Sequence, residues 1–181
     1  SEAFVDSQKG KESDSVVGVG TELAKELEKN GYGVYHDKTK YDQINGTIDR
    51  SKAYNQSLDG MGRVMAENPD IQVTIDLHRD SVGKNKHTFT MIDGKRTAIV
   101  MFFNGMSRSK SGPIDYLHNP NLGANLSFSL QLKCHAMETY EGFTKPIYLK
   151  GYRYNLHMAE RALLVELGNE NNTVEEAKNA A

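Results

Sequence analysis

With 181 residues, the chain is long enough to bury a substantial core, and we expect a single domain over 1–181. Its 22 basic and 24 acidic residues give a formal net charge of −2, so no strong field favours nucleic acid or an anionic membrane, and we expect no nucleic-acid partner. The single cysteine, Cys134, excludes an internal disulfide and a multi-cysteine zinc site, and its helical context predicts a half-buried, unreactive thiol.

The first half of the chain alternates predicted helices with predicted strands. Apolar residues at helical spacing over 16–27 indicate a helix, which ends at Gly31 and leads into a short strand around Val34. A second helix over 47–68 ends before a proline and feeds the strand "IQVTIDLH" at 71–78. Helices that alternate with strands in this way predict crossover connections and a mainly parallel sheet, hence the α/β class.

The second half continues with β-branched and aromatic runs. The predicted elements are strands at 97–103, 145–151 and 161–168, a helix at 119–142, and an excursion or hairpin at 81–95. Thr173 and Glu176 have the spacing of a capping box, which predicts that a last helix begins there. The glycines near the start complete no dinucleotide fingerprint, and the chain contains neither a phosphate-binding loop nor a Gly-x-Ser-x-Gly elbow.

The run "TIDLHRD" at 74–80 places charged residues in a predicted strand. Alternation directs Ile75 and Leu77 to one face of this strand, and Asp76 and His78 to the other. Two interpretations stay open for the polar face. It is either the solvated side of an edge strand or a site at the carboxyl end of the strand, where open α/β sheets bind ligands.

A second polar residue ends another apolar strand. Glu166 closes the run "LLVE", and the carboxyl ends of parallel strands share one edge of a sheet, so Glu166 and His78 are expected to converge. A buried carboxylate without a partner costs several kcal/mol or more. Glu166 therefore either pairs with backbone amides or a basic side chain, or belongs to a site. A catalytic zinc takes three protein ligands, and without a His-Glu-x-x-His motif these must come from separate elements.

Four segments together resemble the catalytic domain of the stage II sporulation protein P family, over nearly the whole chain. They are "VVGVGTELAKELEKNGYGVYHDKTKYD", "TIDLHRDS", "GYRYN" and "RALLVELGNENNTVEEAKN". The family belongs to the peptidoglycan hydrolases called zinc-dependent N-acetylmuramoyl-L-alanine amidases. The resemblance implies an amidase-like fold, with a twisted, mostly parallel sheet and helices on both faces, and a bound Zn²⁺.

The resemblance also implies a set of site residues. Glu2 and His78 match two zinc ligands and Glu166 matches the catalytic carboxylate. A further histidine ligand is expected upstream of Ser1, on an opening strand that is missing here, so the domain is expected to be N-terminally truncated. His36, at the end of a predicted strand, is a weak substitute for that ligand.

The implied reaction is hydrolysis of the amide between N-acetylmuramic acid and L-Ala of the stem peptide, with endopeptidase action on cross-links as a second activity. Glu166 would act as general base and then as general acid. Asp76 shares the strand face of His78 and is expected to accept its second ring proton. Arg79, Arg153 and Asn155 are candidate substrate-binding residues, and for Arg79 a plain salt bridge with its neighbour Asp80 is the alternative.

The same resemblance implies an extracytoplasmic location at the sporulation septum, with a membrane anchor outside this sequence. The expected partners are peptidoglycan glycan strands and stem peptides, and other engulfment proteins, including a lytic transglycosylase. Two other functions stay open: a non-catalytic peptidoglycan-binding module with an incomplete metal site, and a zinc carboxypeptidase-like enzyme that acts on small peptides. Analysis of the reaction products separates these alternatives.

Overall fold

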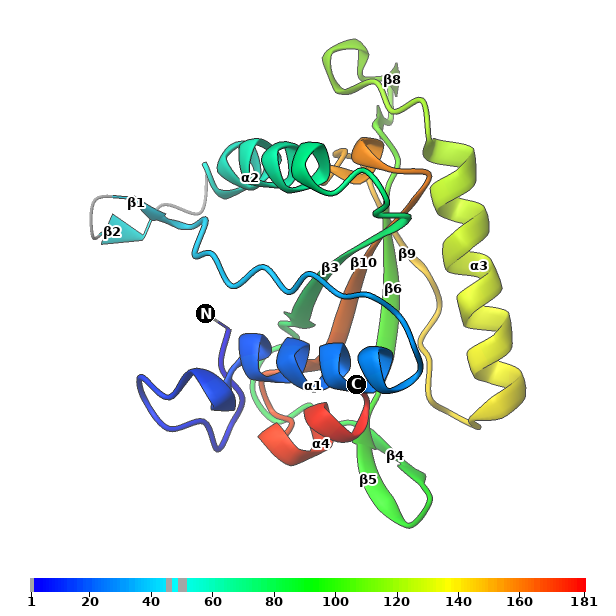
Figure 1. The fold of residues 1–181 in the computed structure, drawn as a ribbon. Helices are drawn as coiled ribbons and strands as arrows, with labels where there is room; N and C mark the ends of the chain where they lie inside the picture. The colour runs from blue at the N-terminus through cyan, green and yellow to red at the C-terminus, as the bar shows by residue number, and fades with distance from the viewer. Residues whose placement is uncertain (1, 45–46, 49–51) are drawn as a thin grey trace.

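The structure, a computed structural model, describes residues 2–44, 47–48 and 52–181. Its α-helices are α1 (Val16–Lys29), α2 (Ala53–Glu67), α3 (Leu122–Thr139) and α4 (Val174–Asn179), and its 3-10 turns are η1 (Glu12–Asp14), η2 (Asp115–Leu117) and η3 (Leu156–Met158). Figure 1 shows the helices arranged around one central sheet. Among the residues described, no helix combines the length and apolar character that crossing a bilayer requires.

The central sheet is mixed. Its order is β3 (Val73–Asp80), β10 (Arg161–Asn169), β6 (Val100–Gly105) and β9 (Tyr148–Lys150). The pairs β3–β10 and β6–β9 are parallel, whereas the central pair β10–β6 is antiparallel. The sheet is therefore mixed, and the expectation of a mostly parallel sheet is corrected at this central pair. The chain goes from β3 to β6 through a hairpin instead of a crossover helix, so β6 runs back in the opposite direction.

In the described part of the chain, three two-stranded ribbons lie outside the central sheet. They are β1 (Gln43–Ile44) with β2 (Thr47–Ile48), β4 (Phe89–Ile92) with β5 (Lys95–Ala98), and β7 (Arg108–Ser109) with β8 (Gly112–Pro113). The β4–β5 ribbon confirms the hairpin expected after β3. Its tight turn places Asp93 and Gly94 at φ values of 50° and 74°, as a two-residue hairpin turn with the strand twist requires.

Some predicted elements differ from those observed. The helix expected over 47–68 begins only at Ala53, because Thr47 and Ile48 pair in β2; residues 49–51 lie outside the described part. The strand expected around Val34 is absent, and residues 32–40 are irregular because no described strand pairs with them. Cys134 is exposed on α3 instead of half-buried. The other predicted strands and helices form, with shifted ends.

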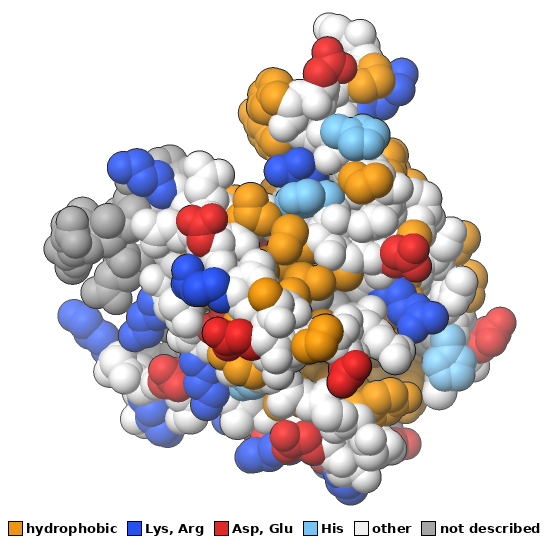
Figure 2. Space-filling view, turned by 45° about the horizontal axis from the view of Figure 1, so that its top comes forward, with side chains coloured by type: hydrophobic (Ala, Val, Ile, Leu, Met, Phe, Trp, Pro, Cys, Tyr) orange, Lys and Arg blue, Asp and Glu red, His pale blue; other side chains and the backbone are white. Residues whose placement is uncertain are grey.

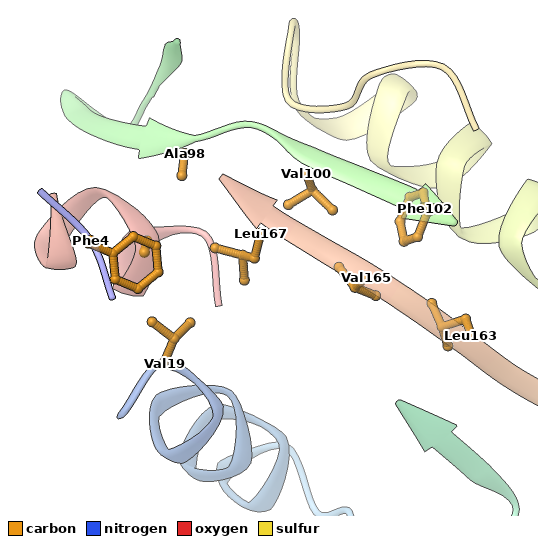
Figure 3. Packing of buried hydrophobic residues seen from close by; sticks show 9 residues of the cluster. Phe4, Val19, Ala98, Val100, Phe102, Leu163, Val165 and Leu167 are labelled. Atoms are coloured by element: carbon orange, nitrogen blue, oxygen red, sulfur yellow. The ribbon is translucent and has the colours of Figure 1, made fainter. Parts of the chain in front are cut away.

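The main apolar cluster lies on one face of the sheet. Its buried members, shown in part in Figure 3, are Phe4, Val19, Ala98, Val100, Phe102, Leu163, Val165, Leu167 and Ala177. Helix α1 contributes Val19 and helix α4 contributes Ala177, and two side chains of α3, Phe128 and Leu132, pack against the cluster. Burial of each large side chain stabilises the fold by about 1.5–3 kcal/mol. Since side chains alternate along β3 and β10, the opposite face receives Asp76, His78 and Glu166, together with the buried Leu164.

A capping network holds α4 against the β4–β5 end of the molecule. The Thr173 hydroxyl accepts from the amide of Glu176 (3.1 Å), and Glu176 Oε2 accepts from the amide of Thr173 (3.1 Å), as predicted for a capping box. The same oxygen lies 2.9 Å from Asn172 Nδ2 and 2.7 Å from His87 Nε2. Although burial raises the pKa of Glu176, these bonds from Asn172, His87 and Thr173 lower it below 4.5.

We expect Glu176→Gln to destabilise the fold by about 1–3 kcal/mol near neutral pH, because buried donors lose a charged acceptor. The pKa of Glu176 is lower in the folded state, so its contribution is present above the ordinary value of 4.5 and is lost as pH falls through the folded value. The difference between the wild type and the variant should therefore shrink in acid. Urea unfolding across this pH range measures it, and a difference that stays constant would contradict the assignment.

Glycine at position 105 allows a close approach of two segments. A Cβ there would lie 2.3 Å from the carbonyl oxygen of Tyr152 and 2.8 Å from that of Arg153. We expect Gly105→Ala to destabilise the protein by about 1–3 kcal/mol, the usual cost of overpacking. Gly62→Ala in α2 is the control, because nothing lies within 4 Å of its Cβ position and alanine favours a helix. Equal unfolding midpoints for the two variants would contradict this prediction.

Candidate functional site

The imidazole of His78 lies between two carboxylates. Its Nδ1 is 3.4 Å from Oε1 of Glu2, and its Nε2 is 3.0 Å from Oδ1 of Asp76. Asp76 and His78 share a face of β3 because they are two residues apart, as predicted. Glu2 is fixed by its other oxygen, which accepts from the backbone amide of Arg79 (2.7 Å). The structure thus brings together residues that are 76 positions apart in the sequence.

The charge of His78 responds to these neighbours. Burial alone lowers the pKa of the imidazole, but hydrogen bonds to Asp76 and Glu2, together with their charges, raise it to about 11. A histidine binds a metal ion only as neutral imidazole, so a metal competes here with the proton that the two carboxylates stabilise.

Glu166 lies directly opposite His78 on the neighbouring strand. The two residues are register partners in the parallel pair β10–β3, which confirms that the two strands bring them together. Oε2 of Glu166 is buried and has no hydrogen-bond partner. Burial raises the pKa of this carboxyl to about 7; the carboxylates of Asp80, Glu2 and Asp76 act in the same direction, whereas His78 opposes them. A carboxyl group that exchanges its proton near neutral pH suits general acid–base chemistry.

An irregularity in β10 follows Glu166. The register with β3 shifts between Glu166 and Asn169, where Gly168 adopts a φ of 67°. A Cβ at Gly168 would lie 2.8 Å from Oδ1 of Asn172 and 2.9 Å from Cβ of Ala98, so both backbone conformation and space favour glycine here. Such bulges are over-represented next to active sites, because they redirect the side chains beside them.

Glu2 and His78 fit two positions of a zinc site. Zinc bonds of about 2.0–2.1 Å in tetrahedral geometry place an oxygen and a nitrogen ligand about 3.3 Å apart, close to the 3.4 Å observed between Oε1 and Nδ1. Within the described ranges, however, no three His, Cys, Asp or Glu side chains are grouped to hold a metal ion. His36, the substitute considered from the sequence, packs at Gly20 of α1 beside Leu77, on the face opposite His78.

Arg79 and Asp80 do not pair through their side chains. Arg79 Nε donates to the carbonyl oxygen of Ala3 (2.6 Å), and its Nη1 donates to the backbone oxygen of Asp80 (2.9 Å). The carboxylate of Asp80 pairs with Lys145 instead, at 3.2 Å. Arg79 therefore fastens the segment that carries Glu2 to the end of β3. Its role in substrate binding stays a prediction.

The other two candidate substrate residues lie in the loop before β10. Asn155, with a φ of 55°, donates through Nδ2 to the backbone oxygen of Tyr54 (2.8 Å) and to Oγ of Ser57 (3.0 Å), which ties the loop to α2. Arg153 donates through Nη1 to the backbone oxygen of His118 (3.1 Å). Both stay predictions as substrate-binding residues, and both also organise the loop.

Sequence reasoning missed the aromatic group on this face. The ring of Tyr154 packs edge-on against Phe103 (4.8 Å between centroids) and against Tyr54 of α2 (5.4 Å). Burial, followed by the nearby charges of Asp76 and others, raises the pKa of Tyr54. Tyr154 belongs to the segment "GYRYN" that carries part of the family resemblance, but nothing in the polar first turn of α2 marked Tyr54.

Comparison with known proteins shows the family of the chain. The family model of stage II sporulation protein P matches residues 1–181. Stage II sporulation protein P of Bacillus subtilis (strain 168) is 31% identical over 170 residues, which cover 90% of this chain and 39% of that protein. The chain thus spans well under half the length of this relative, and no solved structure matches it. The match over the whole sequence shows that the chain belongs to the stage II sporulation protein P family.

Proposed function

We propose that this chain is the catalytic domain of a zinc-dependent peptidoglycan hydrolase with an amidase-like fold. It would cleave the amide between N-acetylmuramic acid and L-Ala of the stem peptide, and also peptide cross-links. The observation that carries the proposal is the position of Glu166 directly opposite His78, with the Glu2 carboxylate 3.4 Å from the imidazole. Membership of a sporulation family supports the biological setting.

Glu2 and His78 would hold the Zn²⁺, with a further histidine from upstream of Ser1. Among the described residues β3 is an edge strand of the central sheet, so its outer edge is open to pairing with a further strand. When bound, the ion supplies Lewis acidity and a water that ionises near neutral pH.

The remaining chemistry belongs to the side chains. Glu166, with one unpartnered buried oxygen, would accept a proton from the attacking water and deliver it to the leaving amide nitrogen. Asp76 would accept the ring proton of His78 and fix the orientation of the imidazole. Arg79 would keep Glu2 in place through the two bonds that it makes with residues 2 and 3.

We expect Asp76→Ala to weaken zinc binding about 10–100-fold, the usual effect of losing a carboxylate that orients a ligating histidine. Asp59→Ala, at an exposed position of α2, is the control. Competition with a chromophoric chelator measures the affinity. If Asp76→Ala binds zinc as tightly as the control, Asp76 has no orienting role.

The wider setting extends the same proposal. The enzyme would act outside the cytoplasm at the sporulation septum, anchored to the membrane by a segment outside this chain. Its partners would be glycan strands, stem peptides and other engulfment proteins, including a lytic transglycosylase. Arg79, Arg153 and Asn155 would contact the substrate near the site.

The second candidate function is a non-catalytic module that binds peptidoglycan, and the incomplete set of candidate metal ligands is the observation that favours it. In the described part of the chain Glu2 and His78 are two candidate ligands that lie together, and no group of three is present. A protein that has lost its metal would still bind peptidoglycan without cutting it. This alternative leaves the buried carboxylate of Glu166 opposite His78 without a role.

Product analysis tests the proposal. The chain, prepared with its natural upstream sequence and zinc, is incubated with purified peptidoglycan beside its Glu166→Gln variant, and the soluble products are identified by mass spectrometry. Free stem peptides that begin with L-Ala, absent with the variant, are the expected result. Intact wall with bound protein would overturn the enzyme in favour of the binding module. Release of C-terminal amino acids alone would indicate a carboxypeptidase.

A further inference from the structure

A separate cavity lies beside the β7–β8 ribbon. It has a volume of about 600 Å³, and its lining includes Arg108, Pro113, Asp115, Tyr116 and Tyr152. Figure 2 shows the projection that carries this ribbon at the top of the molecule, with hydrophobic side chains gathered in the hollow below it. This hollow is open to solvent and is not an enclosed cavity.

The chemistry of the lining suits a neutral, amphipathic ring. Tyr116 and Tyr152 are 79% and 63% exposed, which leaves large aromatic surfaces in water. Such rings pack against the C–H face of a pyranose, while their hydroxyls reach polar groups at its rim. Arg108 and Asp115 carry opposite charges, so the lining is formally neutral and offers no excess charge to an anionic peptide. Pro113 adds apolar surface of the kind that an acetamido methyl group contacts.

The cavity is held in place by backbone bonds between its two walls. The amide of Arg108 donates to the carbonyl oxygen of Gly151 (2.9 Å), and the amide of Met106 donates to that of Lys150 (2.7 Å). A Cβ at Gly151 would lie 2.8 Å from the carbonyl oxygen of Arg108, so the walls approach closely because position 151 is glycine. These bonds hold the backbone beside Tyr152 in position before a ligand arrives, which lowers the entropic cost of binding.

A row of tyrosines leads from this cavity to the site on β3 and β10. The ring of Tyr152 lies 6.4 Å from that of Tyr154, which in turn lies 5.4 Å from Tyr54. Tyr54 is close enough to Asp76 and Glu166 for their charges to raise the pKa of its hydroxyl, after the larger effect of burial. The row of packed rings therefore links the lining of the cavity to the part of the fold that carries Asp76 and Glu166.

We infer that the cavity between Tyr116 and Tyr152 binds an N-acetylhexosamine unit of the glycan strand, away from the sugar whose amide is cut. This inference rests on the proposed function, because it adds a binding site for the glycan strand to a hydrolase that acts on the stem peptide. It makes the enzyme favour stem peptides that are still attached to a strand of several sugars.

The test uses a ligand that carries no peptide. Binding of the N-acetylglucosamine tetramer to the protein is measured by titration calorimetry for the wild type and for Tyr152→Ala and Tyr116→Ala. Each variant should bind about tenfold more weakly, as the loss of an aromatic contact predicts. Tyr152→Phe, which keeps the ring, should retain most of the affinity. Tyr32→Ala is the matched control, because Tyr32 is 65% exposed and lies just after α1.

The outcomes separate this inference from the proposed function. If the wild type does not bind the tetramer, or if Tyr152→Ala binds it as Tyr32→Ala does, the glycan site is wrong, whether or not the protein cuts peptidoglycan. If the tetramer binds and the tyrosine variants lose it while no stem peptide is released, the site stands and the hydrolase fails. Unfolding midpoints equal to that of the wild type show that the variants are folded.

Discussion

Glu166→Gln is expected to lower the rate of amide hydrolysis by about 10²–10⁴-fold, the usual contribution of a general acid–base group. Glutamine keeps the shape of the side chain but can neither accept nor return the proton. The rate is measured on a soluble muramyl peptide with zinc, and binding of the same peptide is measured separately and should change little. Glu28→Gln, at an exposed position of α1, is the matched control and should keep full activity.

The stability of the Glu166→Gln variant against denaturant provides a second test of the role of Glu166. One carboxylate oxygen of Glu166 is buried without a hydrogen-bond partner, an arrangement that costs stability and that the proposed general-base role would explain. Glu166→Gln should therefore unfold at the same denaturant concentration as the wild type or at a higher one, while its activity falls. A variant that loses activity and stability together would indicate a structural role. A variant that keeps its activity would remove Glu166 from the mechanism.

His78→Ala is expected to abolish hydrolysis and to weaken zinc binding by more than about 100-fold, beyond the 10–100-fold loss that an outer-shell partner such as Asp76 produces. The imidazole supplies the nitrogen ligand of the proposed Glu2–His78 zinc site. Its removal also takes away the hydrogen-bond partner that the carboxylates of Glu2 and Asp76 share. Zinc content after dialysis and competition with a chelator measure the effect.

His135→Ala controls for weak surface binding, since His135 is exposed on α3. If His78→Ala and His135→Ala retain the same amount of zinc, the metal does not bind at His78. Far-ultraviolet circular dichroism checks that the His78 variant is folded, and restoration of zinc binding by His78→Cys, another zinc ligand, would show that the loss concerns coordination.

Local pattern determined the elements on which the site depends. Alternation in "VTIDLH" was enough to place Asp76 and His78 on the face opposite Leu77, and the capping box at Thr173 was readable from its spacing alone. The apolar run before Glu166 identified β10, and the expectation that two strand ends meet predicted the pair of Glu166 and His78. The alternation and the capping box depend on a period of two residues and on contacts within one turn, which can be read directly from the sequence. The pair of Glu166 and His78 follows instead from the rule that the carboxyl ends of parallel strands share one edge of a sheet.

Tertiary structure decided what depends on the path of the chain. The β4–β5 hairpin sends the chain back antiparallel beside β10, so alternation of elements alone could not give the direction of β6. Asp80 pairs with Lys145 and not with its neighbour Arg79, because β3 ends near a segment that is 65 residues away in sequence. The tyrosine row and the cavity at Tyr152 also join distant segments. Such contacts follow from topology and packing, and no local period in the sequence encodes them.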